Sequence, residues 1–446
     1  MNPSKVEARD VLAKIEGVGQ PVEFENCTII GDLNLSSKII YKQVYFNNSS
    51  FLGSINSNFT DFKSPVYFDG SNFGNNVYFR ASNFNGTADF ESASFNGNTD
   101  FSMANFEGNT DFSMANFEGN TDFSMANFEG NMDFSGDNFN GPVGFTRTKF
   151  NGEALFSMSS FNNISDFVYS LFNDSADFRL SQFNSSANFC HSKFNKKAFF
   201  YDAGFNGSTW FSQGEFDDDA YFDGAAFRGV LSLTRLKYNK LYIKLDDITQ
   251  LEYDESTYQL LIENFKTLGY YDDADNGYYQ FRVQRFLNRR PERDPLTYIL
   301  DLGAWLFYGF GKKPLYPLCW SLGTVIFFGV FWRAMLKSKQ ESPSTMASGQ
   351  SMQNSTDECS PAMEQDANTH KRRSNVWCEI HWALDPFSFS AATFLSSTRI
   401  FIEPPDIPKS LRWPRWLAKD MYTLERILGA FFSILFFLAI GGTIVR

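Results

Sequence analysis

One periodicity of large apolar side chains dominates the first half of the chain. Phenylalanine recurs at alternating spacings of five and six residues, and from Phe62 to Phe227 all 31 positions of this series are Phe. The register extends back to Phe24 with one break at Ser57, and forward to Leu233. This spacing fits neither the 3.6-residue period of a helix nor the two-residue period of a flat strand. The pattern therefore predicts many short strands joined at regular corners.

The residues around each Phe repeat as well. The eleven residues TDFSMANFEGN begin at Thr99 and occur three times in succession. A small residue lies two positions before most Phe residues, and Asn or Asp usually lies between them. Because alternate strand residues point to opposite sides, we expect the Phe and the small residue to face inward and the Asn or Asp outward. The central core ladder comprises Phe101, Phe106, Phe112, Phe117, Phe123 and Phe128.

This unit of small residue, Asn or Asp, Phe and two variable residues resembles the pentapeptide-repeat family. The resemblance implies a right-handed quadrilateral β-helix, a β-solenoid, over residues 24–233. The extra residue in every second unit, such as Asn109, makes a coil of four sides longer than four exact pentapeptides and predicts slightly enlarged corners. Each Phe would then stack on its equivalent in the next coil, as Phe106 on Phe128. The rod would have about 9.5 coils and a length of about 45 Å.

The flanking segments predict covers for both ends of the rod. Residues 1–20 contain Lys5–Glu16, where apolar and charged residues alternate as in an N-terminal capping helix, and they have no apolar run typical of a signal peptide. We place the β-helix at 21–240 and an α-helical linker at 241–294. The linker predicts two helices, one that ends at Gly269 and one from about Asp273 to Asn288.

Charge is distributed unevenly along the chain. Residues 1–233 carry 28 acidic and 14 basic side chains, whereas the remaining residues carry 23 and 25. An acidic rod repels phosphates, so we expect no direct contact with nucleic acid. Acidic residues one coil apart would form surface columns, which could bind cations, dock a partner, imitate the DNA backbone or simply keep the rod soluble. The column residues are Asp89, Asp111 and Asp133, and Asp100 and Asp122.

No pattern of catalytic or cofactor-binding residues is present. Three scattered His residues give no Ser-His-Asp order, and no phosphate-binding or dinucleotide-binding glycine motif occurs. Cys378 and His381 have a metal-like spacing but no second pair. Five Cys residues without a CxxC motif indicate a reducing compartment. We expect no enzyme activity, no cofactor and no metal.

Residues 295–446 predict a membrane domain. An apolar helix at 295–310 contains Asp301 and would lie at the membrane interface. Two long apolar stretches predict transmembrane helices at 315–336 and 424–445. Between them, 337–375 is rich in Ser, Thr and Gln and predicts a disordered loop. The absence of a signal peptide and a weak excess of basic residues place the β-helix on the cytoplasmic side of the cell membrane.

A short uncharged segment at 386–400 precedes the second span. A helix that re-enters the membrane, followed by a polar strand, is the layout of a tetrameric pore. The chain here resembles the two-helix potassium-channel family, with Phe389, Ser390, Thr393 and Phe394 matching its pore helix. Where that family has Thr-Val-Gly-Tyr-Gly, this chain has a degenerate filter sequence without glycine, so potassium selectivity is not expected. Its residues are Ser396, Ser397, Thr398, Arg399 and Ile400.

Three functions therefore compete. The first is an ion-channel-like membrane protein, a homotetramer in lipid whose rod is an interaction or gating module. The second is a non-conducting membrane scaffold that recruits a protein partner through the β-helix, with Ser388–Ile400 as an amphipathic helix on the membrane. The third is an acidic DNA mimic that acts on a nucleic-acid-binding protein.

Overall fold

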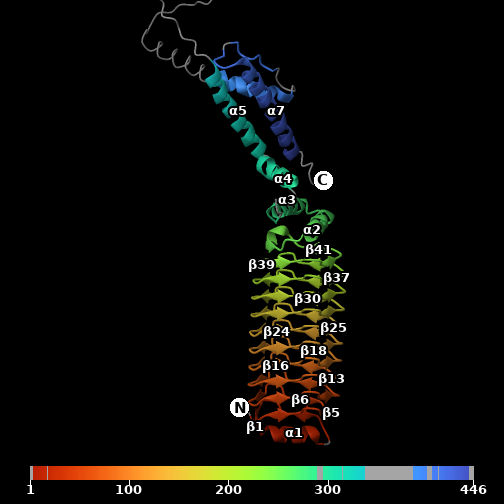
Figure 1. The fold of residues 1–446 in the computed structure, drawn as a ribbon. Helices are drawn as coiled ribbons and strands as arrows, with labels where there is room; N and C mark the ends of the chain where they lie inside the picture. The colour runs from red at the N-terminus through yellow and green to blue at the C-terminus, as the bar shows by residue number, and fades with distance from the viewer. Residues whose placement is uncertain are drawn as a thin grey trace, which may run out of the picture. The chain divides into compact units, whose positions relative to one another are not determined.

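The structure is a computed structural model that describes residues 4–17, 19–288, 295–313, 315–336, 385–398, 404–409 and 411–440. The chain divides into two compact units, 1–284 and 285–446. The first unit is a parallel β-solenoid whose coils stack in one direction, with helices at both ends (Figure 1). The second unit contains two long apolar helices.

Each regular coil contributes one short strand to each of four faces, and each strand pairs in parallel with its equivalent in the next coil. The first face contains β2 (Val22–Glu23), β6 (Val44–Tyr45), β10 (Val66–Tyr67), β14 (Ala88–Asp89), β18 (Thr110–Asp111), β22 (Met132–Asp133), β26 (Ala154–Leu155), β30 (Ala176–Asp177), β34 (Ala198–Phe199), β38 (Ala220–Tyr221) and β41 (Leu241–Tyr242). The second face contains β3 (Cys27–Ile30), β7 (Ser50–Phe51), β11 (Asn72–Phe73), β15 (Ser94–Phe95), β19 (Asn116–Phe117), β23 (Asn138–Phe139), β27 (Ser160–Phe161), β31 (Gln182–Phe183) and β35 (Gly204–Phe205).

The third face contains β4 (Leu33–Asn34), β8 (Ile55–Asn56), β12 (Val77–Tyr78), β16 (Thr99–Asp100), β20 (Thr121–Asp122), β24 (Val143–Gly144), β28 (Ser165–Asp166), β32 (Ala187–Asn188) and β36 (Thr209–Trp210). The fourth face contains β5 (Ile39–Ile40), β9 (Asp61–Phe62), β13 (Asn83–Phe84), β17 (Asn105–Phe106), β21 (Asn127–Phe128), β25 (Lys149–Phe150), β29 (Leu171–Phe172), β33 (Lys193–Phe194), β37 (Glu215–Phe216) and β40 (Lys237–Tyr238). Strand β39 (Ala226–Ser232) joins the second and third faces, and β42 (Ile248–Leu251) pairs with it.

The interior is the aromatic ladder predicted from the sequence. Strand partners are equivalent residues of successive coils, as for Phe106 and Phe128, and the rings of these two residues stack with centroids 4.7 Å apart. Neighbouring columns meet edge to face, as for Phe101 and Phe112 at 5.3 Å. The central Phe side chains are fully buried, and so are small residues such as Thr110 and Ala115. The β-solenoid and the predicted register between its coils are confirmed.

The corners are of two kinds, which explains the alternation of five and six. At one kind, the amide of Ala104 donates to the carbonyl of Phe101 at 3.0 Å, and the second of the two residues between them, Met103, has a positive φ of 60°. This conformation recurs at equivalent corners, as at Met114 and Met125. At the other kind, glycines stack on glycines, and a Cβ placed on Gly119 would lie 2.5 Å from the carbonyl oxygen of Gly97. The extra residue of the repeat belongs to these glycine corners.

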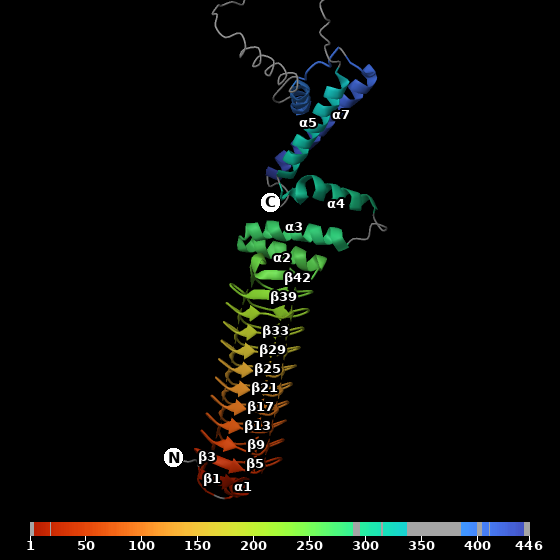
Figure 2. The same ribbon diagram turned by 90° about the vertical axis from the view of Figure 1, so that its left-hand side faces the viewer.

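The N-terminal end of the coil is covered by a strand and a helix. Strand β1 (Ser4–Glu7) pairs with β3, and α1 (Ala8–Glu16) lies across the end of the rod (Figure 2). Val11 of α1 is completely buried. The predicted helix over Lys5–Glu16 is therefore wrong for its first three residues. The edge of β3 presents unpaired backbone groups, and an added strand satisfies them where a helix could not.

The coil continues beyond the boundary predicted at 240, because β41 and β42 complete another turn. The register changes there: Ala220 pairs with Leu241 and Phe227 with Ile248, so this coil is one residue shorter than the regular ones. The period of the earlier coils no longer marks the inward positions, which is why the ladder fades after Leu233 in the sequence. The expected end of the β-helix is thus about ten residues too early.

Two helices close this second end, as the helical linker predicted. Helix α2 (Glu255–Leu268) ends at Gly269, whose φ is 77°, and α3 (Tyr271–Asn288) begins two residues before the predicted start. The Asn264 side chain accepts from the Leu241 amide at 3.1 Å and donates to its carbonyl at 2.8 Å. It thereby replaces the strand partner that a further coil would supply.

The second unit contains α4 (Pro295–Tyr308), the short helix η2 (Gly309–Gly311), α5 (Leu315–Met335) and α7 (Arg415–Ile440). Residues 385–395 are helical and continue into η3 (Ser396–Thr398). The predicted spans agree with α5 and α7, except that α7 begins nine residues before 424 because polar residues extend the helix. The loop predicted at 337–375 and the end of the second span at 441–445 lie outside the described residues.

Candidate functional site

The acidic columns lie on two faces of the rod. Asp89, Asp111 and Asp133 are in register on the first face, and Asp100 and Asp122 on the third. In each case one carboxylate oxygen accepts a hydrogen bond from the backbone amide two residues later, as for Asp111 and Ser113 at 2.8 Å. The outward Asp therefore stabilises the turn that follows its own strand. Burial, with the like charge of Asp111, raises the pKa of Asp89.

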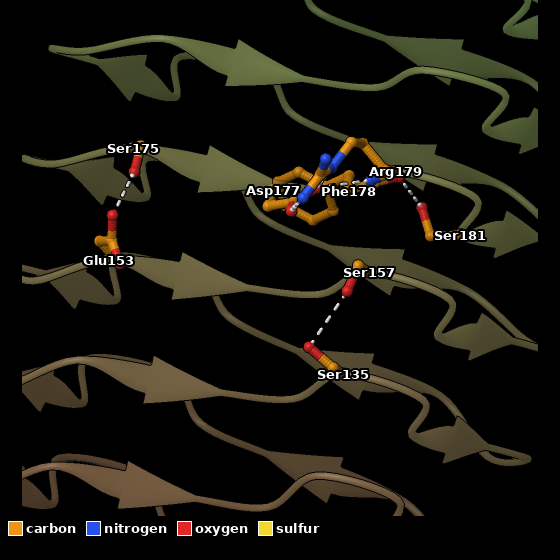
Figure 3. A network of polar contacts seen from close by, with 8 residues as sticks. All are labelled: Ser135, Glu153, Ser157, Ser175, Asp177, Phe178, Arg179 and Ser181. Carbon is orange, nitrogen blue, oxygen red and sulfur yellow. Dashed lines mark hydrogen bonds and ion pairs between the residues drawn. The ribbon is translucent and has the colours of Figure 1, made fainter.

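Further along the first face, the negative charge of the equivalent Asp is neutralised by an Arg side chain. Asp177 accepts from the Arg179 amide at 2.9 Å and forms an ion pair with its guanidinium at 2.6 Å (Figure 3). The figure also shows bonds between coils, from Ser175 to Glu153 and between Ser157 and Ser135. The uncompensated acidic strip is thus confined to the earlier coils, where no Lys or Arg occurs between Arg80 and Arg147.

Asp137 is a buried acid that the sequence prediction missed. It occupies the small inward position of its unit and is 1% exposed. One oxygen accepts from the Ala115 amide at 3.0 Å, and the other has no hydrogen-bond partner among the described residues. Burial raises the pKa of this carboxyl well above its usual range. The sequence did contain a signal for this site, because the equivalent positions one coil before and one coil after Asp137 are occupied by the small residues Ala115 and Ser159.

Replacing Asp137 by serine is expected to stabilise the rod near neutral pH. The raised folded-state pKa means that this group opposes folding increasingly as the pH rises above the unfolded value of about 4, by about 1.4 kcal/mol per pH unit up to the folded pKa. Ser159, one coil further, donates to the Phe134 carbonyl at 2.5 Å, and a serine at 137 should bond the Phe112 carbonyl likewise. Calorimetry at pH 4.5 and 7.5 checks this: the gain should be larger at pH 7.5, and an equal gain at both would contradict it.

The predicted pore-like segment packs between the two long helices. Ser390, Thr393 and Ser396 are fully buried. Ser390 Oγ lies 3.0 Å from the carbonyl oxygen of Val325, at the centre of α5. Ser397 lies beside Gly429 of α7, and Thr398 ends η3. Arg399 lies outside the described residues.

The short helix approaches both α5 and α7 closely, and each of these contacts depends on a glycine of the long helix. A Cβ on Gly329 of α5 would lie 2.2 Å from the Phe387 ring, and a Cβ on Gly429 of α7 would lie 2.5 Å from the Phe394 carbonyl oxygen. Trp332 packs edge to face on Phe389 with centroids 5.0 Å apart. The short helix therefore packs closely against both long helices.

Residues 404–409 and Leu411 lie toward the end of α5. Tyr422 donates to the Pro405 carbonyl at 3.1 Å, and Leu411 bridges to Leu336. Gly429, which lies beside Ser397, is seven residues farther from the start of α7 than Tyr422 is. The non-helical residues 404–409 therefore lie nearer to the start of α7 than the end of the short helix does. Residues 385–398 thus reach the level of mid-α5, whereas residues 404–409 and Leu411 lie nearer to its end. We call these described residues the loop.

A buried polar cluster joins the three elements of this unit. Glu425 of α7 is 0% exposed. Its carboxyl accepts from the Trp332 indole at 2.9 Å and is hydrogen-bonded to the Ser390 hydroxyl. Sequence reasoning did not single out Glu425; the available signal was an acid directly before the apolar stretch that begins at Ile427.

Helices α5 and α7 are long and apolar enough to cross a membrane, with mean hydropathies of 1.6 and 1.5 over their most apolar windows. Large apolar side chains remain exposed along both, including Leu322, Phe327, Ile427, Ile434 and Phe437. This exposure distinguishes them from core helices of a soluble domain. Within the described ranges, no group of three His, Cys, Asp or Glu residues could hold a metal ion.

Comparison with known proteins identifies the repeat. A family model for pentapeptide repeats, built of nine copies, matches residues 90–136 and 101–149. These residues include the three identical copies and the centre of the Phe ladder, so the predicted repeat family is confirmed for this part of the rod. No curated protein and no solved structure matches the chain.

Proposed function

We propose, from the premise that the chain contains pentapeptide repeats wound into a β-solenoid, that this is a membrane protein with an ion-channel-like domain. Four copies would surround a pore, α5 and α7 would cross the bilayer, and the rod would lie in the cytoplasm as an interaction or gating module. The observation that carries the proposal is this loop, in which Ser390 reaches Val325 in the middle of α5 and Leu411 lies at Leu336, beside the end of α5.

The depth of this loop favours a pore over a helix resting on the membrane. From Leu315 to Val325 is about 15 Å of helix, half of a bilayer core of about 30 Å. Irregular backbone is tolerated at that depth only where protein or a water-filled cavity surrounds it. The fully buried Ser396 after the short helix meets this condition.

The polar residues of η3, at the end of the short helix, argue against potassium selectivity. Ser396, Ser397 and Thr398 stand where stacked carbonyl rings require glycine in the channels that the segment resembles. We therefore propose a pore that does not discriminate sharply among monovalent cations.

The test is the mass of the full chain in nanodiscs, measured by light scattering with the lipid contribution subtracted, followed by ion flux from liposomes. We expect four chains of 50.9 kDa per particle and release of both potassium and sodium. A monomeric particle overturns the proposal, because one chain with two spans cannot enclose a pore. A tetramer that releases neither ion overturns conduction.

The second candidate, a non-conducting scaffold, is favoured by one feature of the rod. At one corner, several large apolar side chains are exposed on residues with positive φ, a conformation that generally favours glycine. Core packing does not explain this row, which fits the docking of a protein partner. Its members are Phe59, Met103, Met125 and Tyr169. A monomer without flux, together with partner binding lost on changing Met103 and Met125 to serine, would favour the scaffold.

The third candidate, DNA mimicry, has less support. Each column Asp is engaged by the backbone amide of its own turn, so the acidic columns serve local structure whether or not anything binds them.

A further inference from the structure

Glu425 occupies the one place where the loop and both long helices meet through polar side chains in the described part of this unit. Trp332 of α5 and Ser390 of the short helix bond to its two carboxyl oxygens. These partners are 93 and 35 residues away in the chain. The cluster therefore links the loop to α5 and α7 at a single point.

The number of hydrogen atoms available for donation in this cluster indicates whether the Glu425 carboxyl is protonated. Ser390 Oγ is within hydrogen-bond distance of two acceptors, the Val325 carbonyl and Glu425 Oε1, but a hydroxyl has one hydrogen to donate. Both contacts are satisfied when Ser390 donates to Val325 and the Glu425 carboxyl, carrying a proton, donates to Ser390. Trp332 then donates to the other oxygen.

Burial leads to the same conclusion. Ser390 and Trp332 are neutral, so neither supplies a countercharge to a carboxylate that is fully buried. The charged side chains nearest along the three elements, Arg333, Asp385 and Arg426, are exposed or only half-buried. Burying a carboxylate without a countercharge costs several kcal/mol, whereas a protonated carboxyl with two hydrogen bonds is accommodated.

The surrounding apolar contacts supply no directional bond. At Gly329 and Gly429 the short helix packs closely against the bare backbone of the long helices, which is a smooth face. Gly429 is one turn from Glu425, so both lie on the face of α7 that meets the loop. A directional bond beside this smooth face sets the depth and rotation of the short helix.

We propose that protonated Glu425 is the positioning residue that holds residues 385–398 at mid-depth between α5 and α7. Its consequence for ion flux rests on the channel-like function proposed above, whereas its effect on the loop does not.

The test uses the full chain in nanodiscs and a spectroscopic signature of the proton. The infrared difference spectrum between wild type and Glu425→Gln should contain the carbonyl band of a protonated carboxylic acid at neutral pH, shifted in heavy water. Ser390→Ala should move this band to higher frequency, because its hydrogen bond is lost. The spectra are best recorded in an Asp137→Ser background, which removes the buried Asp137 carboxyl as a second source of such a band. Absence of the band, or a band that Ser390→Ala does not move, overturns the proposal.

Hydrogen exchange measures the positioning. Peptides covering 385–398 should stay protected in Glu425→Gln, whose amide can donate to Ser390 and accept from Trp332, and should lose protection in Glu425→Leu. Arg426→Gln is the matched control and should leave protection unchanged. Unchanged protection in Glu425→Leu overturns the positioning role. A wild type that conducts no ions, with band and protection as expected, would instead count against the channel-like function alone.

Discussion

Replacing Phe112 by aspartate is expected to unfold the central coils of the rod. The Phe112 ring is fully buried and stacks between Phe90 at 4.8 Å and Phe134 at 4.9 Å. Truncating a buried Phe costs about 3–5 kcal/mol, and an unpaired carboxyl among aromatic rings adds several kcal/mol more. Each coil contacts only its neighbours, so the damage should centre on the coils around residue 112.

Hydrogen exchange of the full chain measures this effect peptide by peptide. Peptides covering residues 90–134 should lose protection, while those near β2 and β41 should change less. The same substitution at Phe59, which is 63% exposed at a corner, is the control and should leave protection intact. Full protection of the central peptides in Phe112→Asp would mean that the ladder register is wrong.

Replacing Gly119 by alanine should destabilise the rod more than replacing Gly136 by alanine. At Gly119 the added methyl would meet the Gly97 carbonyl oxygen at 2.5 Å, a backbone atom that cannot move aside without opening the coil. Overpacking of this kind costs about 1–3 kcal/mol. At Gly136 the nearest atom would be a flexible Met114 side-chain carbon at 3.5 Å, and the cost is the positive φ of 74°, about 1 kcal/mol.

The two alanine variants thus distinguish the cost of a close contact between coils from the cost of an unfavourable backbone conformation. Thermal unfolding of both variants beside wild type should give the larger loss for Gly119→Ala. Met114→Gly, which installs at its corner the residue found one coil away at 136, should be neutral or slightly stabilising. Equal losses for the two alanine variants would show that the glycine column is not in contact between coils.

The rod could be predicted from the sequence, because the regular coils repeat the same contacts. A residue that faces inward in one coil meets its equivalent in the next, so packing between coils appears directly as periodicity, from Phe62 to Phe227. The helical linker, the two apolar helices and the short helix before the second span were also local patterns. Asp137 was visible as a departure from the small residues of its column.

The contacts that occur only once could not be predicted and were found in the folded structure. The shortened coil at β41, the Asn264 side chain that completes the last coil and the stacking of Gly97 on Gly119 each depend on neighbours that no local pattern names. The cluster of Trp332, Ser390 and Glu425 brings together residues up to 93 positions apart. A contact made once leaves no period in a sequence, so a single acid beside an apolar stretch acquires meaning only when the fold supplies its partners.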